Sequence, residues 1–387
     1  MTTLYLIRHA EAEGNLYRFA QGQYESDITA LGYKQIDALA ERLRDIKLDA
    51  LYASDLRRTQ ITAGAITRYH ELELSLCPGL REICIGRFEG MSFGNMAHED
   101  PELMRLFRND PDRWHAPGAE TFPECAQRMS KTLTRIAEEN DGKCVAVVSH
   151  GLIQRSFFAQ ICGIPSDKIG SFLHGDNTAV SLLHYENGSF TARYLNDSSH
   201  ISGGLSRRDS DAARRIIKDG IDISDLYYLP LDPSLNADTY VEYYRSAWLA
   251  AHGNLTFFTP EWFLKKAVRH YSEQPESLVG IYRGDELIGI LELDAERGRK
   301  ENYGWISLIC LRSDLRGLGY GVQPLGYAIL YFKRLGRSAL RLHVSAENEK
   351  AVGFYKHHGF EIIDVGSGAG APLYLMEKNF NAVIHRR

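Results

Sequence analysis

The chain lacks the features that would place it in a membrane or on nucleic acid. No run of its 387 residues is apolar enough to span a bilayer. The amino-terminal residues enter a strand-like run at once and carry Arg8, so we expect no signal peptide. A net charge of −5 offers no bulk attraction to nucleic acid. We therefore expect a cytoplasmic protein with neither a membrane nor a nucleic-acid partner.

Cysteine is also scarce, and its spacing excludes the usual disulfide and zinc frameworks. The six cysteines form no C-x-x-C pair, and several lie in apolar, strand-like runs. Reduced, buried thiols are the simplest account. The composition, with 44% hydrophobic and 25% charged residues, is that of a globular protein. The length is comfortable for two domains.

The first organising stretch runs from Thr2 to Asn15. Its apolar run, Leu4 to Ile7, stops at Arg8-His9 and passes into small and polar residues. This pattern predicts a buried strand that opens into a loop at its carboxyl end, where open α/β sheets bind ligands. An Arg beside a His there could meet an anion, although an ordinary strand end explains the pair equally well when it is taken alone.

The same arrangement occurs again later in the chain. The apolar run from Cys144 to Val148 ends in Ser149-His150-Gly151. Between the two runs lie a helix start that carries Arg58 and a block that carries Glu82. Two histidines, two arginines and an acid are a suitable set for handling a phosphoryl group.

The order of these four blocks resembles that of the histidine phosphatase superfamily. The blocks are Arg8-His9, Ser54-x-Leu56-x-Arg58-Thr59-x-x-Thr62-Ala63, Leu80-Arg81-Glu82 and Ser149-His150-Gly151. The resemblance implies a phosphoglycerate mutase-like, three-layer α/β/α domain, with a mixed sheet and its site at the strand ends.

By this resemblance, His9 is the nucleophile that forms a phosphohistidine. Arg8 and Arg58 would hold phosphate oxygens, and His150 would stabilise developing charge. Glu82 would protonate the leaving oxygen, which requires a raised pKa. Further phosphate or substrate contacts fall on Asn15, Gln21 and Gly22. The positive charge is built in, so no metal is required.

Two alternatives stay open in this half. Glu89 also lies in the acid block, although Glu82 occupies the motif position. The family also contains mutases, but the block around the acid, Leu-Arg-Glu-Ile-Cys-Ile-Gly, favours a phosphatase acting on a small phosphorylated metabolite.

The second half has its own organising stretch, from Trp305 to Gly321. A strand runs into a glycine-rich loop and then into an apolar helix, Leu325 to Leu335. Such a loop can turn backbone N–H groups towards an anion, or it can be a plain turn. It is not the dinucleotide fingerprint, which needs Gly at the position of Val322, and it has no Gly-Lys-Ser/Thr.

Arg316-x-x-Gly319-x-Gly321 after a strand resembles the GNAT acetyltransferase superfamily. A second block, Asn348-x-x-Ala351-x-x-Phe354-Tyr355, follows the apolar strand Leu340 to Val344. The resemblance implies an α+β domain that uses acetyl-CoA, whose arm lies between splayed strands at 308–311 and 342–345. The implied cofactor contacts are Leu311, Arg316, Gly317, Leu318, Gly319, Tyr320, Gly321 and Asn348.

The same resemblance makes Tyr355 the general acid for the departing thiolate, with a packed aromatic as the alternative. The general base is not identifiable among Glu292, Glu301 and Tyr303, because many relatives use water. The acceptor would be a small-molecule or peptide amine of unknown identity. The aromatic-rich segment 240–262 either lines the acceptor pocket or packs the core, and core is the safer prediction.

We therefore expect a histidine phosphatase domain at 1–204, a linker at 205–223 and an acetyltransferase domain at 224–387. The linker begins with polar residues and continues into a short helix-like piece, Ala212 to Lys218. The fusion suggests the hypothesis that one compound bears both the phosphate and the amine. Rival functions are a mutase in the first half, a non-catalytic acyl-CoA sensor in the second, or a scaffold that binds neither ligand.

Overall fold

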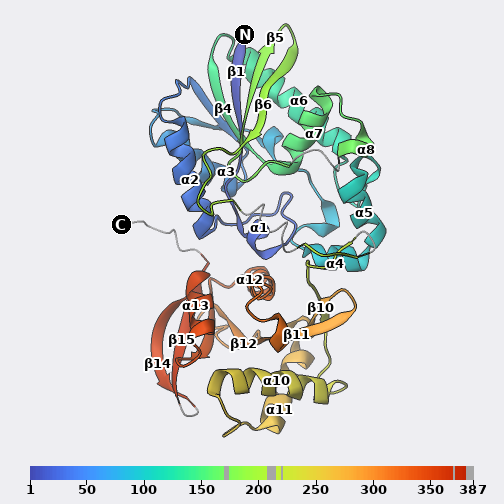
Figure 1. Cartoon of the computed structure of the whole chain (residues 1–387), viewed down its shortest axis with the longest axis vertical. Coiled ribbons are helices and arrows are strands. Elements are labelled where there is room, and N and C mark those ends of the chain that lie inside the picture. Colours follow the sequence, from blue (N-terminus) through green and yellow to red (C-terminus); the bar gives the residue numbers. More distant parts are fainter. Residues whose placement is uncertain (170–173, 207–214, 219–220, 369–370, 381–387) are drawn as a thin grey trace. The chain divides into compact units, whose positions relative to one another are not determined.

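The computed structural model describes residues 1–169, 174–206, 215–218, 221–368 and 371–380. The chain divides into two compact units, Met1–Ser224 and Asp225–Arg387 (Figure 1). Each unit has a sheet and a hydrophobic core of its own.

The first unit is built on a six-stranded sheet with the order β3-β2-β4-β1-β5-β6. The strands are β1 (Thr2–Arg8), β2 (Ala50–Ala53), β3 (Leu74–Leu76), β4 (Cys144–Ser149), β5 (Val180–Glu186) and β6 (Ser189–Asp197). The first four are mutually parallel, whereas β5 pairs antiparallel with β1 and β6. The predicted buried strands at 4–7 and 144–148 are therefore neighbours.

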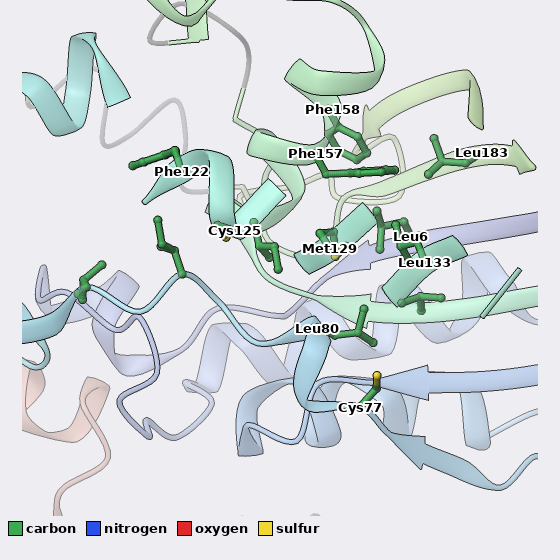
Figure 2. Packing of buried hydrophobic residues seen from close by; sticks show 14 of the residues in the cluster. Leu6, Cys77, Leu80, Phe122, Cys125, Met129, Leu133, Phe157, Phe158 and Leu183 are labelled. Carbon is green, nitrogen blue, oxygen red and sulfur yellow. The ribbon is translucent and has the colours of Figure 1, made fainter. Parts of the chain in front are cut away.

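Helices cover both faces of this sheet, because side chains alternate along each strand. Leu6 of β1 packs in a cluster with residues of α6 (Phe122–Glu139) and α7 (Gly151–Ile161), as Figure 2 shows for Met129 and Phe157. Ile7, one residue on, packs with α2 (Ala30–Leu43) and α3 (Arg57–Thr67) on the other face. The expected three-layer mixed architecture is confirmed.

Shorter helices lie in the connections of this unit. They are α1 (Glu13–Tyr17), α4 (Phe93–Glu99), α5 (Pro101–Asn109) and α8 (Ser166–Ile169). Asp100 ends α4 and accepts a hydrogen bond from the Leu103 N–H at the start of α5. The proline-containing stretch after Glu89 thus forms consecutive short helices.

The segment that we expected to be a linker is bonded to the first unit. The Gln35 amide donates to the Leu205 carbonyl at 2.8 Å, and the Ser206 hydroxyl donates to Asp176 at 2.6 Å. The prediction of a helix at 212–218 is wrong for the residues of this range that the structure describes. Residues 217–218 form strand β7 (Ile217–Lys218), which pairs antiparallel with β8 (Ile221–Asp222), and 212–214 lie outside the described residues. Backbone pairing with β8 prevailed over the weak helical pattern.

The second unit contains a seven-stranded sheet in the order β14-β15-β13-β12-β11-β10-β9. Its strands are β9 (Tyr227–Pro230), β10 (Leu278–Arg283), β11 (Glu286–Asp294), β12 (Tyr303–Leu311), β13 (Ala339–Ser345), β14 (Glu361–Ser367) and β15 (Pro372–Asn379). Its helices are α10 (Ala237–His252), α11 (Pro260–Glu273), α12 (Val322–Arg334) and α13 (Glu349–His357). Of these seven strands, as far as the structure describes them, only β12 and β13 pair in parallel.

The parallel pair opens part of the way along its length. Paired residues run from Tyr303 opposite Ala339 to Ile306 opposite Leu342, and the pairing stops there. At the same level, the register between β11 and β12 shifts by one residue, so that Ser307 is bulged. The strands beyond this point separate as predicted for 308–311 and 342–345.

The aromatic segment that starts at Tyr240 belongs mainly to the core of the second unit. Tyr240 is fully buried, and Phe263 stacks on Tyr244 with ring centroids 4.2 Å apart. The more cautious prediction, core packing, holds for these residues. Trp262 is 58% exposed and lies outside that core.

Two further findings concern membrane-spanning helices and cysteines. No helix in the described part of the chain is long and apolar enough to cross a membrane. All six cysteines are free thiols, three of them buried.

Candidate active sites

The two predicted histidines meet because their strands are parallel neighbours. Arg8 at the end of β1 pairs with Ser149 at the end of β4. The next residue on each strand is a histidine, and the rings of His9 and His150 lie 5.2 Å apart between centroids. The His9 N–H donates to the Ser149 carbonyl at 2.9 Å, which holds the two strand ends together.

One ring nitrogen of His9 is hydrogen-bonded, and the other is available to react. Its Nδ1 lies 2.7 Å from the Ala10 carbonyl, a pure acceptor, so Nδ1 carries the proton and Nε2 carries the lone pair. Burial, and then the charges of Arg58 and Arg8, lower the pKa of His9 well below its usual value of 6.5. His9 is therefore neutral at pH 7, which is the nucleophilic form.

His150 is more deeply buried than His9. Neither ring nitrogen has a hydrogen-bond partner among the described residues, and the residue has no exposed surface. Burial and the charge of Arg58 lower its pKa well below 6.5. A buried polar atom without a partner costs about 1–3 kcal/mol, so such a pair indicates a place for a ligand.

Arg58 is fully buried at the start of α3 and donates hydrogen bonds to the loop formed by residues 21–24. Its Nη1 donates to the Tyr24 carbonyl at 2.9 Å, and its Nη2 donates to the carbonyls of Gln21 and Gly22 at 3.0 and 2.7 Å. Nε is buried without a partner in the described structure. Burial lowers the pKa of Arg58 to about 10, so it remains charged at neutral pH.

Arg8 shows a similar division of its nitrogens. Nη1 donates to the Gly175 carbonyl and contacts His174 Nδ1, whereas Nε is buried without a partner in the described chain. In Arg58 both terminal nitrogens are hydrogen-bonded to loop carbonyls, which leaves Nε, whereas in Arg8 only Nη1 is engaged by the residues that the structure describes. Contacts of either arginine with phosphate stay predictions.

Glu82 accepts three backbone hydrogen bonds, two of them from the start of α7. Oε1 accepts from the N–H groups of Ile83 and Ile153 at 3.0 and 2.8 Å, and Oε2 accepts from Leu152 at 2.9 Å. A helix amino terminus stabilises negative charge. Oε2 accepts one of these bonds, whereas Oε1 accepts two.

Glu89, the alternative acid, has the same pattern of bonds on a different loop. Oε1 accepts from Gln23 and Ile85, and Oε2 accepts from Tyr24. A Cβ on Gly22 would lie 2.4 Å from Glu89 Oε1, so glycine is required for the loop to pack there. Glu89 therefore binds N–H groups of the same loop, residues 21–24, whose carbonyls accept hydrogen bonds from Arg58.

The remaining predicted phosphate contacts, Asn15 and Gln21, are hydrogen-bonded to protein groups, and Asn15 Oδ1 accepts from the distant Asn177 amide at 3.4 Å as well as from its own loop. Asn15 Oδ1 accepts from the Ala12 N–H at 3.1 Å, and Gln21 Oε1 accepts from the Ser26 hydroxyl at 2.5 Å. Their contacts to substrate stay predictions.

Three residues near this site were missed from the sequence. Asn177 donates to the His9 carbonyl at 2.9 Å, and His174 contacts Arg8. Arg128 of α6 donates to the carbonyls of Gly79, Arg81 and Glu82, all within 3.3 Å. Isolated polar residues of this kind carry no local signal, because their partners lie 46–168 residues away.

In the second unit, the predicted loop precedes α12. Gly317 and Gly319 have φ angles of +79° and +86°, which L side chains rarely adopt. The backbone N–H groups from Gly317 to Gly321 donate to no backbone carbonyl in the described chain. Successive free N–H groups before a helix suit an anion.

The side chains predicted around this loop differ in their surroundings. Arg316 bonds back to the Leu311 carbonyl at 2.7 Å and to the Ser246 hydroxyl at 2.8 Å. Asn348 caps α13 by accepting from the Ala351 N–H at 3.2 Å. Tyr355 packs edge-on against Phe354 and Phe360, and burial raises its pKa, which keeps its hydroxyl protonated.

Buried polar groups also gather beneath the bulge. The Tyr240 hydroxyl donates to Glu292 at 2.7 Å, Glu292 lies 2.7 Å from His270 Nδ1, and His270 Nε2 lies 3.0 Å from Asp294. Burial acts to lower the pKa of His270, but the hydrogen bonds to the two carboxylates together outweigh it and raise that pKa. Ser307 and Ser345, on the two separating strands, have buried hydroxyls without partners in the described residues.

No cluster of His, Cys, Asp and Glu among the described residues could hold a metal ion.

The fold and the paired histidines define the class of protein in the first unit. Residues 4–198 match the model of the histidine phosphatase superfamily (branch 1), and the chain belongs to that superfamily. Residues 237–360 match the acetyltransferase (GNAT) family, so a second domain of that family follows in the same chain. Both predicted resemblances are confirmed.

Similar proteins match the first half. A metal-independent phosphoserine phosphatase of Arabidopsis thaliana is 32% identical over 215 residues, which is 54% of this chain and 88% of that protein. Phosphoserine phosphatase 1 of Hydrogenobacter thermophilus is 30% identical over 52% of this chain and 95% of its own length. A probable phosphoglycerate mutase GpmB of an Enterobacter species is 30% identical over 50% of this chain and 89% of its own.

A solved structure shares the fold. Bacillus stearothermophilus YhfR has a TM-score of 0.51 and 29% identity, and the match covers 52% of this chain and all of that one.

Proposed function

We propose that the first domain hydrolyses a small phosphomonoester through a phosphohistidine at His9. The observation that carries the proposal is a neutral His9 with an available Nε2, in a group that leaves four other buried nitrogens without partners: Arg8 Nε, Arg58 Nε and both ring nitrogens of His150. The two arginine Nε–H groups and the single ring N–H of a neutral His150 are the donors that a dianionic phosphoryl group would satisfy.

The proposed reaction has two steps. His9 Nε2 forms a bond to phosphorus as the bond from phosphorus to the leaving oxygen breaks, and Glu82 gives its proton to that oxygen. Water then attacks the phosphohistidine, Glu82 takes a proton from it, and His9 leaves as the neutral imidazole. The expected role of Glu82 requires its Oε2 to be protonated in the substrate complex.

The natural substrate is proposed from the relatives. Two of them are named as phosphoserine phosphatases, which makes O-phosphoserine the first compound to test. A phosphorylated amino acid also fits the idea of one compound bearing both a phosphate and an amine.

The test is hydrolysis of an aryl phosphate and of O-phosphoserine by the full chain with chelator present, beside His9→Ala. We expect metal-independent turnover that the variant loses, and an acid-labile phosphoenzyme trapped by an alkaline quench. Turnover retained by His9→Ala would refute the phosphohistidine. Isomerisation of a phosphoglycerate that requires a bisphosphate would identify a mutase instead.

For the second domain we propose acetyl transfer from acetyl-CoA to an amine. The support is the free N–H run at 317–321 and the opening between β12 and β13, which suit a pyrophosphate and a pantetheine arm. Acetyl-CoA supplies an activated thioester when bound. Tyr355 holds a proton for the sulfur, and the Arg316 bonds to Leu311 and Ser246 brace the loop.

This second activity is tested by CoA binding to the full chain and by thiol release from acetyl-CoA with a panel of amines that includes serine. Binding and amine-dependent release are expected. Binding without release, combined with a change in phosphatase rate, would identify the sensor role instead.

A further inference from the structure

One segment holds a catalytic-site arginine from outside the four sequence blocks. His174 and Gly175, shortly before β5, both contact Arg8 Nη1. The distance from Nη1 to His174 Nδ1 is 3.2 Å, and Gly175 contributes its carbonyl oxygen. His174 Nδ1 also lies 3.3 Å from the Gly175 carbonyl oxygen, a longer contact that would need a proton on Nδ1. A guanidinium nitrogen can only donate, so the contact with Arg8 requires Nδ1 to accept and places the ring proton on Nε2.

The packing around His174 and Arg8 leaves little room for another arrangement of these two side chains. A Cβ on Gly151, the first residue of α7, would lie 2.3 Å from His174 Cε1 and 3.1 Å from Arg8 Nε. A Cβ on Gly175 would lie 2.4 Å from Asn196 Oδ1. The imidazole, the guanidinium and the start of α7 are therefore in close contact, and glycine at both positions permits it.

The contact occupies one nitrogen of Arg8 and leaves another without a partner among the described residues. Nη1 is occupied by the 174–175 segment, whereas Nε stays buried without a described partner.

We propose that His174 is a positioning residue for phosphoryl transfer: through Nδ1 it holds Arg8 so that Nε is directed at the phosphate. The inference rests on the proposed phosphatase function and adds a residue to that site. Loss of the contact lets the guanidinium rotate, which weakens binding of the phosphoryl group in both the ground state and the transition state.

Three variants at His174 separate the role of Nδ1 from that of Nε2. His174→Asn places an amide oxygen close to the position of Nδ1 and keeps an acceptor for Arg8. His174→Gln places its amide close to the position of Nε2 and loses that acceptor. His174→Ala loses both.

The probe is orthovanadate, with its affinity measured by calorimetry on the full chain, alongside kcat and KM for an aryl phosphate. A hydrogen bond with a charged partner contributes about tenfold or more in affinity. We expect His174→Ala and His174→Gln to weaken vanadate binding about tenfold, and His174→Asn to restore most of it. Adding His174→Ala to Arg8→Ala should cause little further loss.

Wild-type affinity in His174→Ala, or full affinity in His174→Gln with a loss in His174→Asn, would overturn the proposal. Ring ¹⁵N shifts of the ligand-free protein supply a test that is independent of activity. They should show His174 protonated at Nε2, with the His174→Asn spectrum giving the assignment. Protonation at Nδ1 would contradict the proposal even if the phosphatase is active, whereas failure of the proposed function would show separately, as turnover that His9→Ala retains.

Discussion

At the scale of single residues, Glu82 and Glu89 form a natural pair for comparison. Each accepts two N–H groups on Oε1 and one on Oε2, so replacement by glutamine removes equivalent bonds. A glutamine amide presents its own N–H to some of these donors, which costs about 1–3 kcal/mol of stability at either position. Only Glu82 is proposed to transfer a proton.

We therefore predict similar losses of thermal stability in Glu82→Gln and Glu89→Gln but different losses of activity. Glu82→Gln should lower kcat/KM, which reports formation of the phosphohistidine, about 100-fold or more for O-phosphoserine and much less for an aryl phosphate, whose leaving group needs no proton. Steady-state kinetics with both substrates is the measurement. An equal loss of kcat/KM on both substrates would exclude Glu82 as the acid.

At the scale of elements, the role of the turn before α12 in binding CoA can be tested by comparing it with the turn after that helix. Gly317 and Gly336 have φ angles of +79° and +70°, and a Cβ on either would meet no atom within 4 Å. Alanine at either position should therefore lower the stability only through the strain of a left-handed backbone, by about 1–2 kcal/mol. Gly317 lies in the free N–H run, whereas Gly336 follows the other end of the helix.

Gly317→Ala and Gly336→Ala should thus lose similar stability, while only Gly317→Ala weakens CoA binding, by about tenfold if one N–H to the pyrophosphate is lost. Calorimetric titration with CoA and thermal melts provide the two readouts. Equal CoA affinity in both variants would place the pyrophosphate elsewhere.

At the scale of the whole molecule, the two units should respond differently to acid. In the first unit, burial lowers the pKa of His9, His150 and His200, the last to about 4. Below the usual value of 6.5 the unfolded chain takes up protons that the folded unit does not, so stability falls as pH falls through 6.5. Each such group contributes a slope of about 1.4 kcal/mol per pH unit.

His270 in the second unit has the opposite sign. Its raised pKa gives stability that is fully present below 6.5 and is lost as pH rises through the folded value. His252 and His343, whose pKa values are lowered, act against it in the same unit. The second unit should therefore be the less acid-sensitive of the two.

Calorimetric melts of the full chain between pH 5.5 and 7.5, in a buffer without phosphate, can measure this difference. His200→Gln should flatten the acid slope of the first unit, and His270→Gln should steepen that of the second. A first-unit transition that is insensitive to acid would contradict neutral burial of its histidines.

Much of the architecture was determined by the sequence alone, because it depends on local periodicity and strand ends. The runs at 4–7 and 144–148 are buried strands, and being parallel neighbours they bring His9 and His150 together. Positive φ at Gly317 and Gly319 likewise follows from what glycine permits. The four blocks and the loop motif then sufficed for both families.

Only the tertiary structure decided how the charged groups are held. Arg58 gives its terminal nitrogens to the 21–24 loop, and Arg8 gives one of its own to the 174–175 segment. Glu82 receives its hydrogen bonds largely from α7, 70 residues further on. Hydrogen-bond partners so distant in sequence are chosen by packing and by the need to satisfy buried polar atoms, and no local pattern records that choice.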